Sequence, residues 1–454
     1  MVGAAILAFV PATVVAVNVT NLVVTRLVSP HVLPKMDYRD GVPPEHGAFV
    51  VMPALLSDEE ELTSLLRQLE RHYLTNRDPN FYFGLLTDFA DAAQEWEPGD
   101  EELLAAARAG IAALNRRYRR EEPGPFFLLH RSRLWNESEG TWMGWERKRG
   151  KLAELNRLLL RGATDTSFLL DAGEIESLPR VRYVVTLDAD TVMPRDTARR
   201  LVAALAHPLN RARFDPRTGR VTAGYTILQP RVQVLPTSAN QSLFTRIFSP
   251  DTGLDLYTRA VSDVYQDLFG EGVFVGKGIY DLAAFDRSLD GRIPENALLS
   301  HDLFEGIHGR AGLVTDVILY EDYPPGYLTY ARRLHRWLRG DWQLLPWLWF
   351  RVPGAGGTTL PNRLSALDVW KIVDNLRRSL RAPALMLLLL AGWVWLPGSP
   401  LFWTLVALAT DAVPLLASLI TQLLLAVRGR ADAAMYAAKA AGGGVQGWRE
   451  STGT

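Results

Sequence analysis

The chain contains no cysteine, so neither a disulfide nor a thiolate metal site is available to it. It also lacks an excess of either charge, because 49 lysines and arginines nearly balance 50 aspartates and glutamates. The basic surplus that is typical of nucleic-acid-binding proteins is therefore missing, and we expect no nucleic-acid partner. The 454 residues are enough for one large domain or for two to three average ones.

Long hydrophobic runs are confined to the two ends of the chain. Residues 4–28 are long enough to span a bilayer, and they lack the basic start and cleavage site of a signal peptide. Residues 384–396 and 402–427 are two further candidates, of which the first is short for a span. Asp411 lies inside the last run, where a charge needs a partner or a function. The alternative is a soluble protein with buried apolar helices.

Basic residues beside these runs orient them and predict that the polar middle of the chain is cytoplasmic. They are Arg26, Lys35, Arg363, Lys371, Arg377, Arg378, Arg381, Arg428 and Arg430. We therefore expect five parts: a transmembrane helix with its lead-in (1–33), a polar α/β domain (34–330), interfacial amphipathic helices (331–380), two transmembrane helices (381–428) and a flexible tail (429–454).

Apolar runs alternate with helical patterns through the middle of the chain. The strand candidates are residues 47–53, 81–86, 126–130, 183–187 and 221–229, and the helix candidates are 57–73, 99–120, 153–161 and 194–205. This alternation predicts a doubly wound, mostly parallel sheet.

Asp188 and Asp190 directly follow the strand candidate 183–187. Ligands of open α/β sheets bind at the carboxyl ends of strands. Two carboxylates at this place suit Mg²⁺ or Mn²⁺ held jointly with a diphosphate, whether the backbone there is extended or turned. The alternative is an Asx turn that leads into the next helix.

Two other segments suit a nucleotide. Asp88 ends the strand candidate 81–86 and can accept hydrogen bonds from a base or ribose, although a helix cap is an alternative. Residues 147–151 form a basic turn before the helix candidate 153–161, and such a turn suits phosphate unless it is only a solvated face.

Residues 270–278 are rich in glycine but do not have the spacing of a P-loop, since Gly278 follows Lys277 where a hydroxyl is required. These glycines either let the backbone approach a sugar or phosphate closely or form a hairpin turn.

Further along, Asp302 lies between apolar residues, so burial would raise its pKa towards that of a general base, unless Asp302 only caps a helix. Arg333 and Arg336 share a helix face beside Trp337. Guanidinium groups suit a leaving diphosphate and tryptophan suits a sugar ring, while the alternative is a basic helix on a membrane surface.

In combination these segments resemble the processive family 2-like membrane glycosyltransferases, whose pattern is D, DxD, [TE]D and QxxRW. They are more similar still to the glycosyltransferase domain of the cyclic β-1,2-glucan synthases, family 84. The resemblance extends over about residues 4–427, nearly the whole chain. The segments that carry it are MDYRDGVP (36–43), WERKRGKL (145–152), TLDADT (186–191), GKGIYD (276–281), SHDLFEG (300–306) and HRWLRGDWQ (335–343).

The resemblance implies a GT-A-like domain that uses UDP-glucose and inverts the configuration at the transferred carbon. It implies Mg²⁺ or Mn²⁺ on Asp190 and Asp188, Asp302 as the general base, and Arg336 beside the leaving group. Donor-binding residues would be Asp88, Lys148, Gly150, Lys151, Asp188, Arg333 and Arg336; acceptor-binding residues would be Trp337, Gly276 and Lys277. The implied partners are a glucan acceptor and a lipid bilayer. The implied location is the bacterial plasma membrane, which the chain would cross several times.

The sequence departs from these families in three places. Arg333 stands where family 2 has glutamine, which leaves its donor contact open. The further modules of the cyclic glucan synthases, among them a phosphorylase-like region, are expected as partners outside this chain. Residues 431–442 resemble the last helix of a diguanylate cyclase domain. The alternatives are another polysaccharide synthase of the cellulose, chitin or hyaluronan type, a synthase of lipid-linked sugars, and a non-catalytic membrane component.

Overall fold

The computed structural model describes residues 2–118, 124–162, 165–249, 263–294, 296–298, 300–413, 416 and 419. Two compact units divide the chain. One unit holds residues 1–26, 250–256 and 380–454, and the other holds residues 27–249 and 257–379. The predicted tail, 429–454, lies outside the described residues.

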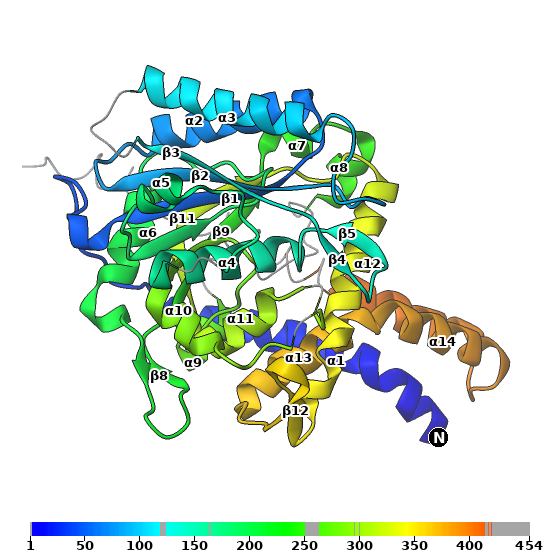
Figure 1. The fold of residues 1–454 in the computed structure, drawn as a ribbon. Coiled ribbons are helices and arrows are strands. Elements are labelled where there is room, and N and C mark those ends of the chain that lie inside the picture. The colour runs from blue at the N-terminus through cyan, green and yellow to red at the C-terminus, as the bar shows by residue number, and fades with distance from the viewer. Residues whose placement is uncertain are drawn as a thin grey trace, which may run out of the picture. The chain divides into compact units, whose positions relative to one another are not determined.

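The larger unit is built on one seven-stranded sheet (Figure 1). Its strands, in spatial order, are β11 (Ala311–Glu321), β9 (Ile227–Val234), β10 (Gly278–Asp281), β6 (Tyr183–Thr186), β1 (Ala48–Leu56), β2 (Phe81–Phe89) and β3 (Phe126–Arg131). Only β10 runs antiparallel to its neighbours. The predicted mostly parallel α/β sheet is therefore confirmed.

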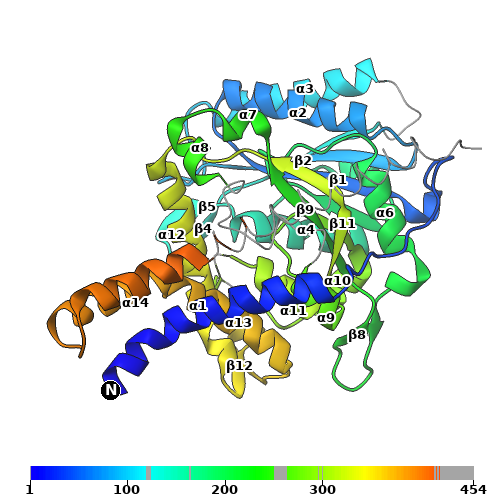
Figure 2. The same ribbon diagram turned by 180° about the vertical axis from the view of Figure 1, so that it is seen from behind.

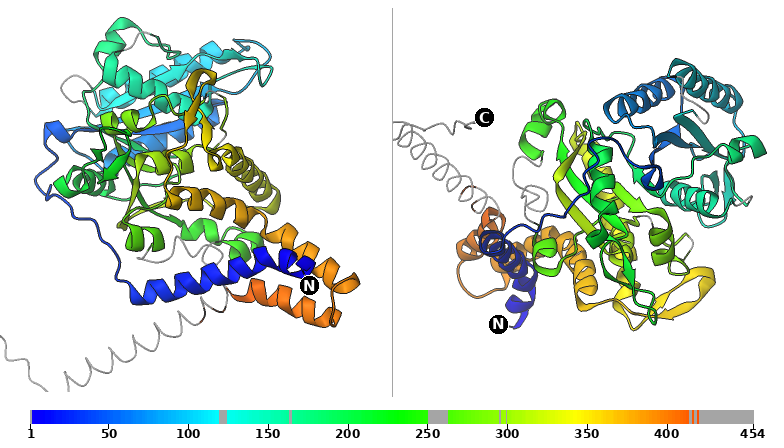
Figure 3. Two further views of the ribbon diagram at one scale, coloured as in Figure 1. Left: turned by 90° about the horizontal axis from the view of Figure 1, so that it is seen from below. Right: turned by 90° about the vertical axis from the view of Figure 1, so that its left-hand side faces the viewer.

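Helices cover both faces of this sheet, as the alternating pattern predicts. One apolar core lies between the strands and α2 (Glu59–Thr75), α3 (Asp100–Arg117) and α6 (Thr197–Ala206). A second core lies on the other face, against α4 (Arg147–Arg161) and α10 (Leu282–Leu289). Figures 2 and 3 show these helices from behind and from two further directions.

The remaining elements of the larger unit are short helices, hairpins and two longer helices near its end. They are η1 (Pro44–His46), β4 (Leu134–Asn136), β5 (Thr141–Met143), α5 (Ala172–Glu176), η2 (Pro208–Asn210), β7 (Arg213–Phe214), β8 (Val221–Ala223), α7 (Pro236–Ala239), α8 (Leu243–Phe248), α9 (Val264–Phe269), α11 (Asp302–Gly309), α12 (Tyr327–Gln343), η4 (Leu345–Leu348), β12 (Arg351–Pro353), η5 (Ala355–Gly357), β13 (Thr359–Pro361) and α13 (Ala366–Ser379).

Two predicted elements differ from the structure. The strand expected over 221–229 is two strands, β8 and β9, because Gly224 between them has a φ of +65°. The basic residues expected as a turn before a helix instead form the first turn of α4.

The smaller unit contains apolar helices. Within the described residues, α1 (Val2–Leu27) is the one helix long and apolar enough to cross a membrane, over Leu7–Thr25. The other two are shorter: α14 (Arg381–Val394) and a helix over Pro400–Val413. Most of residues 414–427, the end of the last predicted span, lies outside the described part of the chain. Several crossings therefore stay a prediction. Asp411 does have the partner expected for it, since its Oδ1 lies 2.5 Å from Arg381 Nη2.

Candidate active site

The site is built around the turn that follows β6. This strand lies between β1 and β10, and all of its residues are buried. The chain then turns at Asp188. The Thr191 N–H donates to the Asp188 carbonyl at 3.0 Å, and the Asp188 N–H donates to Thr191 Oγ1 at 3.1 Å. Asp188 and Asp190 therefore approach one another through a turn and not along an extended chain.

A third carboxylate joins this turn from the edge of the sheet. Val192 and Tyr320 exchange backbone hydrogen bonds of 2.7 and 3.0 Å, which place the end of β11 beside the turn. As a result, carboxylate oxygens of Asp188, Asp190 and Glu321 all lie within 4.8 Å of one another. Sequence reasoning missed Glu321, although the signal that identified Asp188, an acid at the end of an apolar strand, is present there too.

Two lysines face these acids. Lys148 Nζ lies 2.5 Å from Asp188 Oδ1 and also donates to the Gly276 carbonyl at 2.7 Å. Lys277 is 4 % exposed, lies 3.1 Å from Asp188 Oδ2 and pairs with Glu321. Burial opposes ionisation of Asp188, but the ammonium groups of Lys148 and Lys277 outweigh it and lower its pKa to about 2. Asp188 is therefore charged at neutral pH, as a metal ligand requires.

Asp302 begins α11 and packs against the glycine-rich segment. Gly276 has a φ of +82°, and a Cβ built on it would lie 2.6 Å from Asp302 Oδ1. Glycine at this position therefore allows both the left-handed backbone and the close approach of the carboxylate. Burial raises the pKa of Asp302, as its apolar neighbours predict, and Lys148, Lys277 and Arg336 partly oppose this.

Glu305 lies one helical turn after Asp302 and is 7 % exposed. Burial, with a smaller contribution from the Asp302 charge, raises the pKa of Glu305 from 4.5 to about 8. The folded protein thus holds a proton on Glu305 between these two pH values, where the unfolded chain has released it. This carboxyl should therefore lower stability progressively as the pH rises from about 4.5 towards 8.

We expect Glu305→Gln to remove that pH dependence. The free energy of unfolding that the variant gains over the wild type should be about 1–4 kcal/mol larger at pH 8.5 than at pH 5. The reason is that the amide carries no charge that must be buried. Thermal unfolding of the two proteins in the same detergent at both pH values tests this. The exposed Glu102→Gln on α3 is the control. Parallel pH profiles for wild type and Glu305→Gln would contradict the prediction.

Asp88 belongs to a buried ion cluster beneath the turn. Asp88 and Arg131 are opposite one another in β2 and β3, and their side chains pair with Nε–Oδ1 and Nη2–Oδ2 distances of 2.7 and 3.0 Å. Lys151 Nζ lies 3.0 Å from Asp88 Oδ2 and donates to the Ala54 carbonyl at 2.7 Å. Burial lowers the pKa of Lys151 to about 8, although Asp88 opposes this. The nucleotide contacts expected of Asp88 and Lys151 stay predictions. In this structure the two side chains form an ion pair with one another.

Arg131, which sequence reasoning also missed, fixes the start of α4. It is fully buried, and its Nη1 and Nη2 donate to the carbonyls of Trp145 and Arg147 at 2.9 and 3.1 Å. Glu146 and Arg147 both have positive φ, so the chain makes a sharp entry into the helix that carries Lys148. Gly150 permits this entry, because a Cβ there would lie 1.9 Å from the Trp145 carbonyl oxygen.

Gly150→Ala should therefore destabilise the larger unit by roughly 1–3 kcal/mol, since backbone, not a movable side chain, blocks the methyl group. The shift of the α4 entry should also weaken the UDP binding that the resemblance implies for Lys148. Thermal unfolding and titration with UDP measure the two effects. Gly326→Ala is the matched control, because a Cβ at Gly326 meets nothing within 4 Å. Equal unfolding temperatures for the two variants would show that the entry is not constrained as described.

Helix α12 brings the arginines to the acids. Arg333 Nη2 lies 3.6 Å from Glu321 Oε2, and its guanidinium carbon lies 4.6 Å from the centre of the Trp337 ring. The Arg336 charge acts on Asp302. Trp337 is 40 % exposed. A Cβ on Gly340 would lie 2.5 Å from Ser300 Cβ, so α12 packs closely against the segment that precedes Asp302.

The structure therefore brings most of the predicted site residues together: Asp188, Asp190, Lys148, Gly276, Lys277, Asp302, Arg333 and Arg336, with Trp337 beside them. Asp88, Gly150 and Lys151 lie in the buried layer that supports Lys148. Their individual roles stay predictions.

Comparison with known proteins bears directly on this cluster. The sequence profile described as glycosyl transferase family group 2 matches residues 183–427, more than half of the chain. The chain belongs to this family. The resemblance inferred from the motifs is thereby confirmed, and the matched region includes Asp188, Asp302 and α12.

A curated relative, the cyclic beta-(1,2)-glucan synthase NdvB of Rhizobium meliloti (strain 1021), is 47% identical over 398 residues. The match covers 87% of this chain but 14% of that protein, so the chain spans a small part of its relative.

Two solved structures overlap with the chain at low TM-scores. Mannosyl-3-phosphoglycerate synthase from Rubrobacter xylanophilus has 14% identity and a TM-score of 0.32, covering 68% of this chain and 80% of its own. A mycobacterial protein has 11% identity and a TM-score of 0.27, covering 64% and 74%.

Proposed function

We propose that this chain is an inverting, GT-A-like glucosyltransferase that transfers glucose from UDP-glucose to a growing β-1,2-glucan. The observation that carries the proposal is the convergence of three carboxylates, two lysines, the half-buried Asp302 and the arginines of α12 at the turn after β6. Family membership supports glycosyl transfer, and the 47% identity to a cyclic glucan synthase supports glucose as the sugar.

The carboxylates of Asp188, Asp190 and Glu321 fit a divalent cation. Mg²⁺ and Mn²⁺ prefer hard oxygen ligands, and three such oxygens lie within one coordination sphere's reach of each other. When bound, Mg²⁺ or Mn²⁺ would neutralise charge on the donor diphosphate. Lys148 and Lys277 already lie at these carboxylates, where they would meet the same phosphates.

Asp302 would accept the proton of the acceptor hydroxyl. That oxygen forms a bond to the anomeric carbon of glucose as the bond from this carbon to UDP breaks, so an α-linked donor gives a β linkage. Arg333 and Arg336 would stabilise the negative charge that develops on UDP. Trp337 would stack on the acceptor glucose, with Gly276 and Lys277 lining the acceptor side. Asp88, Gly150 and Lys151 would hold the donor end of the site in place.

We place the larger unit on the cytoplasmic side of the bacterial plasma membrane, with α1, α14 and the helix over Pro400–Val413 as membrane segments. Synthase modules outside this chain, such as a phosphorylase-like region, would act on the product.

Incorporation of radiolabelled glucose from UDP-glucose by membranes that contain this chain tests the proposal. The assay is run with and without Mn²⁺ or Mg²⁺, and the product is analysed for its linkage. Membranes with the Asp302→Asn variant are the control. A metal-dependent β-1,2-glucan is the expected result. Donor binding without any product would contradict the proposal and would identify the chain as a binding component.

A further inference from the structure

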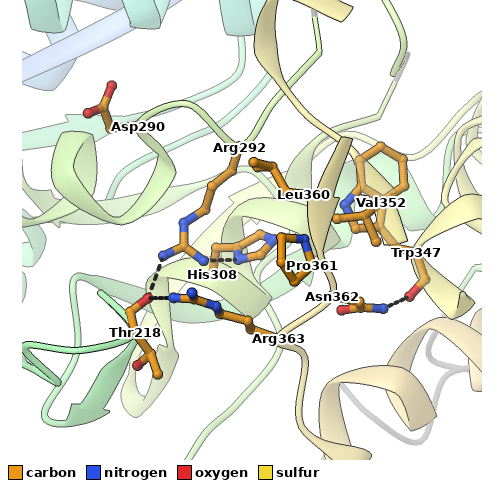
Figure 4. A pocket seen from close by; sticks show the side chains of 10 residues that line it. All are labelled: Thr218, Asp290, Arg292, His308, Trp347, Val352, Leu360, Pro361, Asn362 and Arg363. Atoms are coloured by element: carbon orange, nitrogen blue, oxygen red, sulfur yellow. Dashed lines mark hydrogen bonds between the residues drawn. The ribbon is translucent and has the colours of Figure 1, made fainter. Parts of the chain in front are cut away.

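A cavity of about 260 Å³ lies in the larger unit, lined by none of the active-site residues (Figure 4). The β7–β8 hairpin, the turn before Arg292, α11 and the β12–β13 hairpin contribute its walls. Its apolar lining is Trp347, Val352, Leu360 and Pro361, and its polar lining is Thr218, Asp290, Arg292, His308, Asn362 and Arg363.

Two arginines of this cavity donate to backbone carbonyls and, within the described residues, to no carboxylate. Arg292 Nη2 donates to the Gly219 carbonyl at 3.2 Å, and Arg363 Nη1 donates to the Thr218 carbonyl at 3.1 Å. Neighbouring Arg220, by contrast, forms an ion pair with Asp368, with an Nη2–Oδ2 distance of 2.8 Å. Across the described ranges, neither Arg292 nor Arg363 forms an ion pair with a carboxylate. Arg292 is partly buried and Arg363 is exposed, and an anionic ligand in the cavity would give both guanidinium groups a charged acceptor.

His308 adds a third donor beside Arg292. Burial, and then the charges of Arg292 and Arg220, lower the pKa of His308 to about 3, so the imidazole is neutral. Its Nδ1 lies 3.5 Å from Arg292 Nη1, which can only donate, and Nε2 must therefore carry the hydrogen. In the described part of the chain this buried Nε2 has no hydrogen-bond partner.

Exposed aromatic side chains adjoin the cavity wall. Trp349 and Phe350 are 67 % and 94 % exposed. The wall residue Asn362 holds their segment, since its side chain donates to the Trp349 carbonyl at 2.7 Å and its N–H donates to the Phe350 carbonyl at 2.9 Å. Exposed Trp and Phe are characteristic of surfaces in contact with a lipid interface, and α1 is long enough to cross a membrane.

We propose that this cavity binds the phosphate of an anionic lipid headgroup. Arg292 and Arg363 would donate to the phosphate oxygens, and Trp349 and Phe350 would enter the interface. Free phosphate shares the recognised group, but the exposed aromatic pair favours the lipid. The inference does not depend on the proposed glucosyl transfer.

Binding of a short-chain phosphatidylglycerol to the full chain in uncharged detergent tests this, with phosphatidylcholine and inorganic phosphate as comparison ligands. Wild-type protein should bind phosphatidylglycerol at least about tenfold more tightly than phosphatidylcholine, and Arg292→Gln with Arg363→Gln should abolish this preference. Arg213→Gln removes a charge from the same hairpin without touching the cavity and should leave it unchanged.

Trp349→Ala with Phe350→Ala replaces exposed side chains and gives a second measurement should the arginine variant not fold. It should weaken binding of phosphatidylglycerol severalfold and leave inorganic phosphate unaffected. Equal phosphatidylglycerol affinity in wild type and the arginine variant would overturn the site. Inorganic phosphate that binds as tightly as the lipid, with no effect of the aromatic variant, would overturn the assignment to a lipid.

Discussion

Asp302→Asn should lower glucosyl transfer by about 10²- to 10⁴-fold while binding of UDP-glucose stays within a few-fold. The amide cannot accept the acceptor proton, and a general base contributes a factor of this size. The side chain keeps its shape, so its packing against Gly276 is retained. Single-turnover transfer and equilibrium binding of the donor, measured on the same preparation, separate the two quantities.

Glu305→Gln and Asp322→Asn accompany this experiment, because both positions carry acids close in sequence to the proposed site. Both variants should keep most of the activity. If Asp302→Asn kept normal turnover while one of them lost it, that residue would be the base and the assignment of Asp302 would be wrong. Wild-type activity should also fall as the pH drops through the raised pKa of Asp302, since the protonated carboxyl no longer accepts a proton.

Asp190→Ala should weaken metal-dependent donor binding by about tenfold or more. The variant removes one of the three carboxylates that can reach a common ion, and the two that remain leave the ion more weakly held. Burial also raises the pKa of Asp190, so metal binding by the wild type should weaken as the pH falls and this carboxyl is protonated. Titration with UDP-glucose at several Mn²⁺ concentrations measures both effects.

Glu321→Gln distinguishes a three-carboxylate site from the Asp-x-Asp pair alone, and it should reduce Mn²⁺ dependence as Asp190→Ala does. Asp322→Ala, at the exposed neighbouring position, is the matched control and should bind donor normally. Unchanged Mn²⁺ dependence in Asp190→Ala would remove this residue as a ligand. Loss of Mn²⁺ dependence in Asp190→Ala but not in Glu321→Gln would limit the metal ligands to Asp188 and Asp190 of the turn.

Local patterns predicted the elements that carry the site. The strand that ends at Asp188 follows from its run of apolar residues, and the helix that carries Arg333 and Trp337 was expected as an amphipathic basic helix; both are present. The start of α4 was not predictable in this way. It depends on two residues with positive φ and on Arg131, which reaches it from a neighbouring strand.

What the sequence by itself determined is the alternation of strands and helices between residues 47 and 229, the mostly parallel sheet and the acids and bases available at strand ends, because these depend on burial periodicity and residue chemistry over a few positions. The strands β10 and β11 were not predicted. Only the tertiary structure decided which of these groups meet. Glu321 reaches Asp188 through the pairing of Val192 with Tyr320, and Asp88 is neutralised by Arg131 through the register of β2 and β3. Such pairings join residues far apart in the chain, and their geometry is fixed by how the strands pack.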